Sequence, residues 1–304
     1  NWTGNLSYYD TISVNIGSYN FQDLDDNNVK IWTYLPNAAS DQYLINDTVT
    51  SVLKTAMSGT YTIGGASPNF IAISTAISQL VDRGMCGDVT FNIRDGYYQD
   101  TIYLPILKKV NSNLKLTLQS ESGIAGNTSL VAQNNKKAVV VNGAEHVKIS
   151  KININGSNSI SAVTIYGGKD LEVSDCAIYG AFQGSLTTAS FKKLKIFNNV
   201  IFGQMYTLVL GGTNNFRFTD VDVSNNQLSS YFGSGNIITL QYIDTLRFDS
   251  NIIPAGSLGS QTSFSYITDF MVKNNSVKTI NSLCMNFDNS LNGKIFNNMV
   301  VSSG

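Results

Sequence analysis

Four carboxylates recur in the second half of the chain at a spacing that could bind a metal ion. Asp170 and Glu172 stand two residues apart, and Asp220 and Asp222 repeat that pair 50 residues later. Carboxylate oxygens are the hard ligands that Ca²⁺ prefers. If the four side chains converge on one face of a sheet, they would hold a Ca²⁺ ion.

Two cationic side chains in the same stretch could act as a base. Lys195 lies between the two carboxylate pairs, and Arg247 follows Asp222 by 25 residues. Beside a bound Ca²⁺, either would remove the proton next to a uronate carboxylate. One functional hypothesis is therefore a lyase that cleaves acidic polysaccharide by β-elimination. A glycosidase is less well supported, because His146 is the only histidine and the second half has no Asp-Asp pair.

These charges also have a structural interpretation, because they belong to two columns in which the sign alternates over the central stretch. One column reads Lys148, Glu172, Lys195, Asp222, Arg247, Met271 and Lys294, and the other reads His146, Asp170, Lys193, Asp220, Thr245, Asp269 and Asn292. Opposite charges stacked at an exposed surface attract by about 1 kcal/mol or less, and like charges repel similarly. We favour this interpretation, a lattice of salt bridges, over an active site.

Both columns belong to a sequence pattern that repeats every 23 to 27 residues. Its central positions are Ile152, Cys176, Asn199, Asn226, Asn251, Asn275 and Asn298. Apolar residues recur three positions before and two positions after each of them, and five positions before all of them except Asn298. This pattern is typical of stacked coils, in which each unit buries its apolar face against its neighbours.

Asparagine suits the central position of such a stack. Equivalent side chains of a parallel sheet lie about 4.8 Å apart, so an amide can donate to one neighbouring coil and accept from the other. We expect a buried ladder of amides formed by Asn199, Asn226, Asn251, Asn275 and Asn298. Cys176, at the same position, is expected to be a small buried apolar residue.

Two regions precede the clear repeats. Residues 1–57 alternate in short apolar runs, such as Ile12 to Ile16, which predicts antiparallel strands in a small sandwich. Residues 70–83 have apolar side chains at helical spacing and end at Gly84. An amphipathic helix at this point would cap the open end of the first coil.

Short motifs in both regions resemble known families. They are Gly17-Ser18-Tyr19-Asn20-Phe21 and Ile31-Trp32 in the first region, and Gly59-Thr60-Tyr61-Thr62-Ile63-Gly64-Gly65, Cys86-Gly87-Asp88-Val89-Thr90-Phe91 and Asp95-Gly96-Tyr97-Tyr98 in the second. Residues 1–57 resemble the C-terminal part of an immunoglobulin-like adhesion module, which implies a partial β-sandwich. Residues 58–304 resemble the right-handed parallel β-helices of the pectin-lyase-like superfamily, closest to those in multidomain secreted or surface proteins of gliding Bacteroidetes. The second resemblance implies a fold but no particular activity.

Aromatic residues near the turns are candidates for sugar contacts. Tyr206, Tyr231 and Phe232 flank glycine-rich segments, where exposed rings can stack on the apolar faces of sugars. The alternative is that these rings complete the core.

Composition limits the partners of the chain. Its 304 residues include 20 basic and 21 acidic side chains, for a net charge of −1. The chain has no basic stripe for nucleic acid or anionic lipid. It also has no apolar run near the roughly 20 residues that span a bilayer. We expect no nucleic-acid partner and no membrane insertion.

The leading hypothesis is a non-catalytic β-helical module of a larger secreted or surface protein, outside the cell or on its outer surface. Such a module would act as an adhesin or spacer, contact polysaccharide or cell-surface glycan without a cofactor, and adjoin other domains of the same polypeptide. The alternatives are the Ca²⁺-assisted lyase and a purely structural stalk.

Overall fold

The computed structural model describes residues 7, 9–15, 17–35, 40, 45, 48–133, 136–156, 161–231, 235–254, 260–280 and 285–303. The chain divides into two compact units, Asn1–Ala56 and Met57–Gly304. In the described ranges, no helix has the length and apolar content needed to cross a bilayer.

The first unit contains a small antiparallel sheet. Strands β1 (Asp26–Trp32) and β2 (Thr48–Lys54) pair so that Ile31 lies opposite Val49. Residues 11–15, which were expected to form a strand, lie outside any strand. Two strands bury little apolar surface and give a third strand little to pack against. The described part of this unit is therefore a two-stranded sheet rather than a sandwich.

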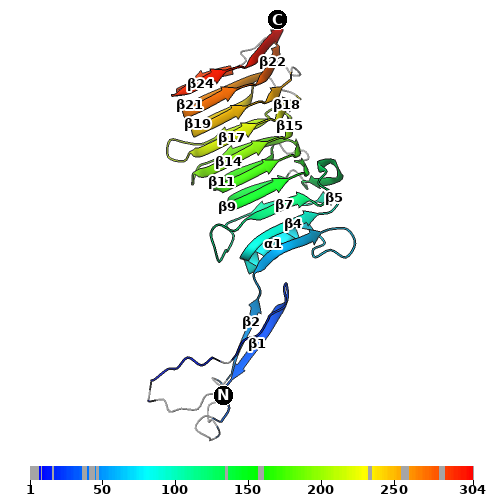
Figure 1. Cartoon of the computed structure of the whole chain (residues 1–304), viewed down its shortest axis with the longest axis vertical. Coiled ribbons are helices and arrows are strands. Elements are labelled where there is room, and N and C mark those ends of the chain that lie inside the picture. Colours follow the sequence, from blue (N-terminus) through cyan, green and yellow to red (C-terminus); the bar gives the residue numbers. More distant parts are fainter. Residues whose placement is uncertain are drawn as a thin grey trace. The chain divides into compact units, whose positions relative to one another are not determined.

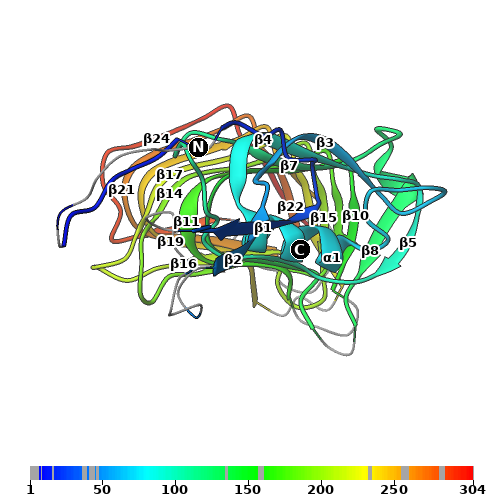
Figure 2. The same ribbon diagram turned by 90° about the horizontal axis from the view of Figure 1, so that it is seen from below.

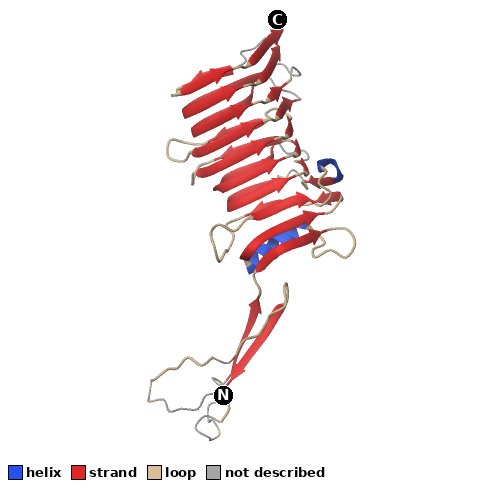
Figure 3. Ribbon diagram, viewed as in Figure 1, coloured by secondary structure: helices blue, strands red, loops and turns tan. Residues whose placement is uncertain are grey.

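The second unit confirms the predicted right-handed parallel β-helix. Figure 1 shows its coils stacked one upon another, and Figure 3 shows that strands dominate them. One sheet has nine strands, one from each successive coil, in the order β25-β22-β20-β18-β15-β12-β10-β8-β5. Their bounds are Gly96–Gln99 (β5), Thr128–Val131 (β8), Asn153–Asn155 (β10), Ala177–Tyr179 (β12), Val200–Gly203 (β15), Gln227–Ser230 (β18), Ile252–Ile253 (β20), Ser276–Ile280 (β22) and Met299–Ser303 (β25).

The remaining strands form a 14-stranded sheet that bends around the other sides of the coil. The long strands β9, β11, β19 and β21 each cover two of these sides. The bounds are Met57–Ile63 (β3), Met85–Ile93 (β4), Ile102–Leu104 (β6), Leu116–Ser120 (β7), Val139–Ser150 (β9), Ser161–Ser174 (β11), Ala181–Ser185 (β13), Phe191–Phe197 (β14), Leu208–Gly211 (β16), Phe218–Ser224 (β17), Gly235–Asp249 (β19), Ser260–Lys273 (β21), Met285–Asp288 (β23) and Gly293–Phe296 (β24). A short 3-10 helix, η2, spans Ala125–Asn127.

The helix predicted over 70–83 begins three residues later, as α1 (Ile73–Arg83). Phe70 instead forms a parallel bridge with Ile63. The Ser74 backbone N–H donates to Asp100 Oδ2 at 2.8 Å and so satisfies one open donor of the first turn. The helix ends at Gly84, where φ is +77° and a side chain would be strained.

Helix α1 covers the first coil with its apolar side. Ile73, Ala76, Ile77 and Leu80 are buried, and the helix packs against β3 and β6. Burying an aliphatic side chain of this size contributes about 1.5 to 3 kcal/mol. The helix therefore removes core side chains from water where no earlier coil lies beneath them.

Five asparagines connect the coils through directional hydrogen bonds; Asn199, Asn226, Asn251 and Asn275 are buried, whereas Asn298 in the last coil is half-buried rather than buried as expected. Asn199 donates from its backbone N–H and from Nδ2 to Asn226 Oδ1, at 2.9 and 3.1 Å. Its second amide hydrogen goes to the Val173 carbonyl at 2.9 Å. Asn226, Asn251 and Asn275 repeat this pattern toward Asn298. Each of these amides thus exchanges bonds with the coil on either side.

The residue before each central position bends the backbone. It has a φ between +51° and +58° in seven consecutive coils: Lys151, Asp175, Asn198, Asn225, Ser250, Asn274 and Asn297. Asn and Asp tolerate this left-handed conformation better than most other side chains. A recurring Asn-Asn pair therefore performs two tasks, because the first residue turns the chain and the second bridges the coils.

Cys176 occupies the ladder position before Asn199, and its backbone makes the same hydrogen bond as the backbone of an asparagine there. Its backbone N–H donates to Asn199 Oδ1 at 2.9 Å. Its thiol lies 3.2 Å from the Ser174 carbonyl and 3.9 Å from the Ile149 carbonyl, the group to which an asparagine in this position would donate. Burial raises the pKa of this thiol to about 12, so the thiolate that reactive cysteines require is disfavoured.

Interrupting the ladder should destabilise the β-helix. We expect Asn226→Ala to lower the free energy of unfolding by about 3 kcal/mol, because it leaves buried donors and acceptors on both neighbouring coils without partners. Urea unfolding followed by circular dichroism measures this change.

Cys176→Asn is the matched control. Its amide can reach the Ile149 carbonyl, so the unfolding free energy should stay within about 1 kcal/mol of the wild type or rise. Equal stability of Asn226→Ala and the wild type would contradict a stabilising ladder.

Candidate functional site

Outward side chains of β9, β11, β14, β17, β19, β21 and β24 form a charged face. Its central column is the first of the two whose sign alternates in the sequence, and the strand pairing places its members side by side from Lys148 to Lys294. Lys148 Nζ lies 2.8 Å from Glu172 Oε1, and Arg247 Nη1 lies 3.1 Å from Asp222 Oδ2. Opposite charges on adjacent coils thus form ion pairs at two points of the column.

The four carboxylates considered as calcium ligands do not come together. Lys195 lies in register between Glu172 and Asp222, so the two acidic coils are two steps, or about 9.6 Å, apart. Asp170 is bound by other side chains, and Asp220 points outward on its own coil. Among the described residues, no group of three His, Cys, Asp or Glu side chains is arranged to hold a metal ion.

The two cations considered as bases lie in different environments. Arg247 is held between Asp222 and Asp249, and the hydrogen bond to Asp249 raises its pKa. A guanidinium held in this way does not accept a proton. Lys195 is exposed and has no ion pair with any residue that the structure describes. Of these two candidate bases, Lys195 is therefore the one that is not held in an ion pair with a described residue.

Asp170 joins two neighbouring coils through a pair of bonds. Its Oδ2 lies 2.9 Å from His146 Nδ1, and its Oδ1 lies 2.8 Å from Lys193 Nζ. Partial burial raises the pKa of Asp170, but the hydrogen bonds from Lys193 and His146 outweigh it and leave the pKa lowered. The His146 side chain is only 12% exposed. Asp170, His146 and Lys193 therefore link three successive coils and have a structural role.

Asp249 is the most enclosed carboxylate of the charged face. Arg247 Nη2 donates to its Oδ2 at 2.7 Å, while Ser250 and Asn274 donate to its Oδ1 at 2.8 and 3.0 Å. Lys273 Nζ lies 3.5 Å from Oδ2. Burial raises the pKa of Asp249, but the hydrogen bonds and the nearby Lys273 outweigh burial and lower the pKa from 3.8 to about 2. The carboxylate is therefore ionised and fully engaged at neutral pH.

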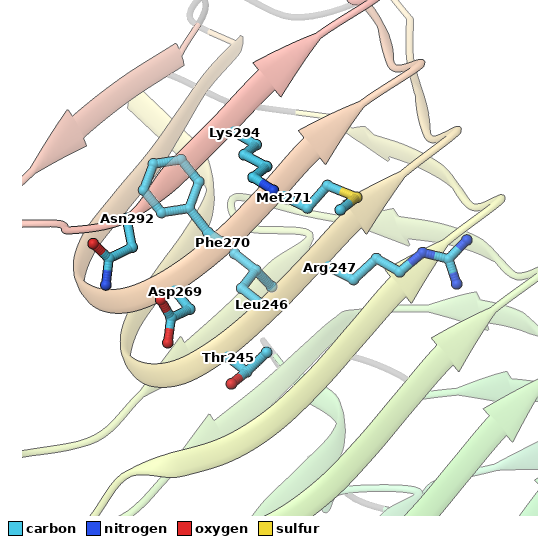
Figure 4. A pocket seen from close by; sticks show the side chains of 8 residues that line it. All are labelled: Thr245, Leu246, Arg247, Asp269, Phe270, Met271, Asn292 and Lys294. Carbon is cyan, nitrogen blue, oxygen red and sulfur yellow. The ribbon is translucent and has the colours of Figure 1, made fainter.

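A shallow depression of about 320 Å³ lies on the charged face near the last coils (Figure 4). Gly293 takes the place of an inward side chain there, and the Phe270 ring occupies the space that a Cβ would need. The depression is lined by Thr245, Leu246, Arg247, Asp269, Phe270, Met271, Asn292 and Lys294. Its polar rim carries both signs of charge, and its floor is apolar. We find no paired acid and base across it.

Exposed aromatic rings gather on the nine-stranded sheet instead. Tyr179 and Phe202 pair in register on β12 and β15, and the Phe202 ring contacts Tyr231 edge-on at 6.2 Å between centroids. Their side chains are 46%, 36% and 63% exposed, respectively. We call these three rings the aromatic cluster. In Figure 2 the sheet that carries it lies on the opposite side of the coils from β14 and β17.

The sequence identified part of this cluster. Tyr231 is in it, whereas Tyr206 lies on the turn between β15 and β16 and is 42% exposed. Phe232 lies outside the described residues. Tyr179 and Phe202 were not singled out, although both stand three positions after a central residue of the repeat, which is an outward position. That offset was the signal that could have found them.

Other aromatic residues near the turns have structural partners. Tyr242 and Tyr266 stack with centroids 4.7 Å apart, and Arg217 lies over the Tyr242 ring at 6.0 Å. Lys137 lies over the Tyr166 ring. These rings contact residues of neighbouring coils. The aromatic cluster is therefore the group of rings best placed to bind a ligand.

Acid should remove the stabilisation that Asp249 contributes. Its folded-state pKa of about 2 lies below the ordinary value of 3.8. The contribution is therefore fully present above about pH 4 and is lost as the pH falls through the folded-state pKa. Thermal unfolding of the wild type and Asp249→Asn should differ most at neutral pH, and the difference should shrink below about pH 4.

Asp269→Asn is the control for this series. Asp269 is exposed and forms no ion pair with the described residues, so its replacement should change the melting temperature little at any pH. A melting difference for Asp249→Asn that stays constant down to about pH 2 would contradict the assignment.

No protein-family model matches this chain, and no curated protein matches it. Two solved structures resemble it, both of the pectin methylesterase from Aspergillus niger, in deglycosylated and penultimately deglycosylated forms. Each is 13% identical over 79% of this chain and 87% of that chain, with TM-scores of 0.49 and 0.45.

Proposed function

We propose that this chain is a non-catalytic β-helical module that binds carbohydrate through the aromatic cluster. The observation that supports the proposal is the exposure of Tyr179 and Phe202 on adjacent strands of one sheet, together with Tyr231 directly after the next strand, β18. Large apolar rings at outward strand positions gain little for folding, whereas sugars offer apolar ring faces that stack on them. A Phe in such a position has no hydroxyl that would favour contact with water.

The setting of the module belongs to the same proposal. Residues 1–57 resemble an immunoglobulin-like adhesion module, and the β-helix resembles those in surface proteins of gliding Bacteroidetes. We therefore assign the chain to a larger secreted or surface protein, in which it serves as an adhesin. Its β-helix also acts as a rigid spacer between the neighbouring domains.

Removing one ring should weaken glycan binding without unfolding the protein. A glycan array with the wild type identifies ligands, and we expect Phe202→Ala and Tyr179→Ala each to weaken binding to the best of them by about tenfold, or 1.4 kcal/mol. Both side chains lie on the surface of the sheet, at 46% exposure for Tyr179 and 36% for Phe202, so the melting temperature should change little.

Tyr103→Ala is the matched control, because this ring is 48% exposed but lies on β6, in the other sheet. It should bind glycans as the wild type does. An array without reproducible sugar-specific binding would refute the proposal and favour a structural stalk.

The lyase hypothesis predicts a different result. Incubation with pectin, alginate and glycosaminoglycans, with and without Ca²⁺, should produce no rise in the absorbance of unsaturated sugars, because three of the four candidate calcium ligands, Asp170, Glu172 and Asp222, are held by neighbouring cations. Clear turnover that Lys195→Ala or Arg247→Ala abolishes would instead make this chain an enzyme.

A further inference from the structure

The nine-stranded sheet presents a face without charge over most of its length. One outward column runs through all nine strands and reads Tyr97, Ser129, Asn153, Ala177, Val200, Gln227, Ile252, Ser276 and Met299. The second outward column reads Gln99, Val131, Asn155, Tyr179, Phe202 and Ser229 over β5 to β18. We call these 15 residues the uncharged face. None of them carries a charge.

The contrast with the charged face is sharp, because both belong to the same coils. From β9 to β24, each coil directs a charged residue outward on the charged face, with Met271 as the exception. The 15 positions of the uncharged face are neutral, and the charged residue Lys278 of β22 lies outside them on the same sheet. Along the turn that borders the uncharged face, Lys151 and Asp175 lie on adjacent coils and are opposite in sign. Asn198 Nδ2 donates to Asp175 at 3.3 Å. A charged ligand would find no complementary charge above the aromatic cluster.

The aromatic cluster follows the axis of the β-helix. Tyr179 and Phe202 occupy the same position of consecutive coils, about 4.8 Å apart. Tyr231 follows the strand of the next coil and contacts Phe202. A ligand that lies along the axis meets three rings in succession, whereas one that crosses the coils meets a single ring of this line. The arrangement therefore suits a linear chain rather than an isolated sugar.

Neutral amides flank this line of rings. Asn153 and Gln227 lie in the first column, on either side of the short apolar pair Ala177 and Val200. Neither amide side chain forms a hydrogen bond with another described residue. Each offers donors and an acceptor to a ligand. Rings for stacking and amides for hydroxyl groups together match a polyhydroxylated chain without charge.

We infer that the ligand of the uncharged face is a neutral polysaccharide that lies along the β-helix axis over Tyr179, Phe202 and Tyr231. This inference rests on the proposed function and adds to it the ligand class and its direction. A flat apolar surface of this kind could also bind another protein, which the experiment distinguishes.

Titration calorimetry with oligosaccharides of known length tests the inference. The panel contains neutral β-glucan, xylan and mannan fragments, and acidic galacturonate and alginate fragments, each at low salt and at about 0.5 M salt. We expect a neutral series to bind with an affinity that increases with length and changes less than about twofold with salt. Phe202→Ala should weaken it about tenfold.

A pair of variants reports on the charge of the ligand. Gln227→Glu and Gln227→Lys change the same exposed side chain in opposite electrostatic directions. Toward a neutral ligand, neither variant should make binding depend on salt. Toward an acidic ligand, the Lys variant would bind more tightly and the Glu variant more weakly, both in a salt-dependent way.

The possible outcomes distinguish failure of this inference from failure of the proposed carbohydrate-binding function. Salt-dependent binding of acidic fragments that Phe202→Ala abolishes would overturn the inference and leave the carbohydrate-binding function intact. Neutral binding that is unchanged by Phe202→Ala and Tyr179→Ala would overturn the assignment of the face. Absence of binding to every fragment, or self-association that Phe202→Ala abolishes, would overturn both.

Discussion

Each coil of the β-helix meets the next at about 4.8 Å, so every side chain lies against the side chain one repeat away. This stacking in register decides which residue types a column can hold. An amide can stack on its own kind, because it carries donors and acceptors together. The ladder from Asn199 to Asn298 uses that property, and the left-handed residue before each member directs the amide inward. Stability therefore accumulates from contacts between neighbouring coils.

Stacking in register also limits charged residues, but like charges cannot stack on one another as amides do. A column of like charges would repel at every step, so the charged face alternates in sign and its acids find partners on the coils above and below. Asp249 represents the limit of this arrangement, since four donors surround a carboxylate that is almost fully enclosed. Groups held in this way contribute to the cohesion of the coils and have little freedom to bind a metal ion or transfer a proton.

The uncharged face, with Tyr231 at its border, is where the stacking exposes aromatic rings. Tyr242 and Tyr266 stack on each other, and Phe182 is buried in the core. In contrast, Tyr179, Phe202 and Tyr231 keep much of their ring surface in water. A rigid parallel sheet holds these rings at fixed positions, so a linear ligand would lose little free energy in ordering them. That is the physical basis for assigning recognition to this side of the coils.

Sequence alone determined the repeat, the inward and outward columns, the amide ladder and the alternation of charge, because these follow from residue type at a fixed period. It also placed a helix before the first coil, although Phe70 joined a bridge instead of the helix. The three-dimensional structure decided which outward columns share a side, because that depends on where each coil bends. The bends arise from backbone conformation at residues such as Asp175 and Asn198. For that reason the separation of the calcium candidates and the gathering of Tyr179 with Phe202 and Tyr231 emerged only when the coils were stacked.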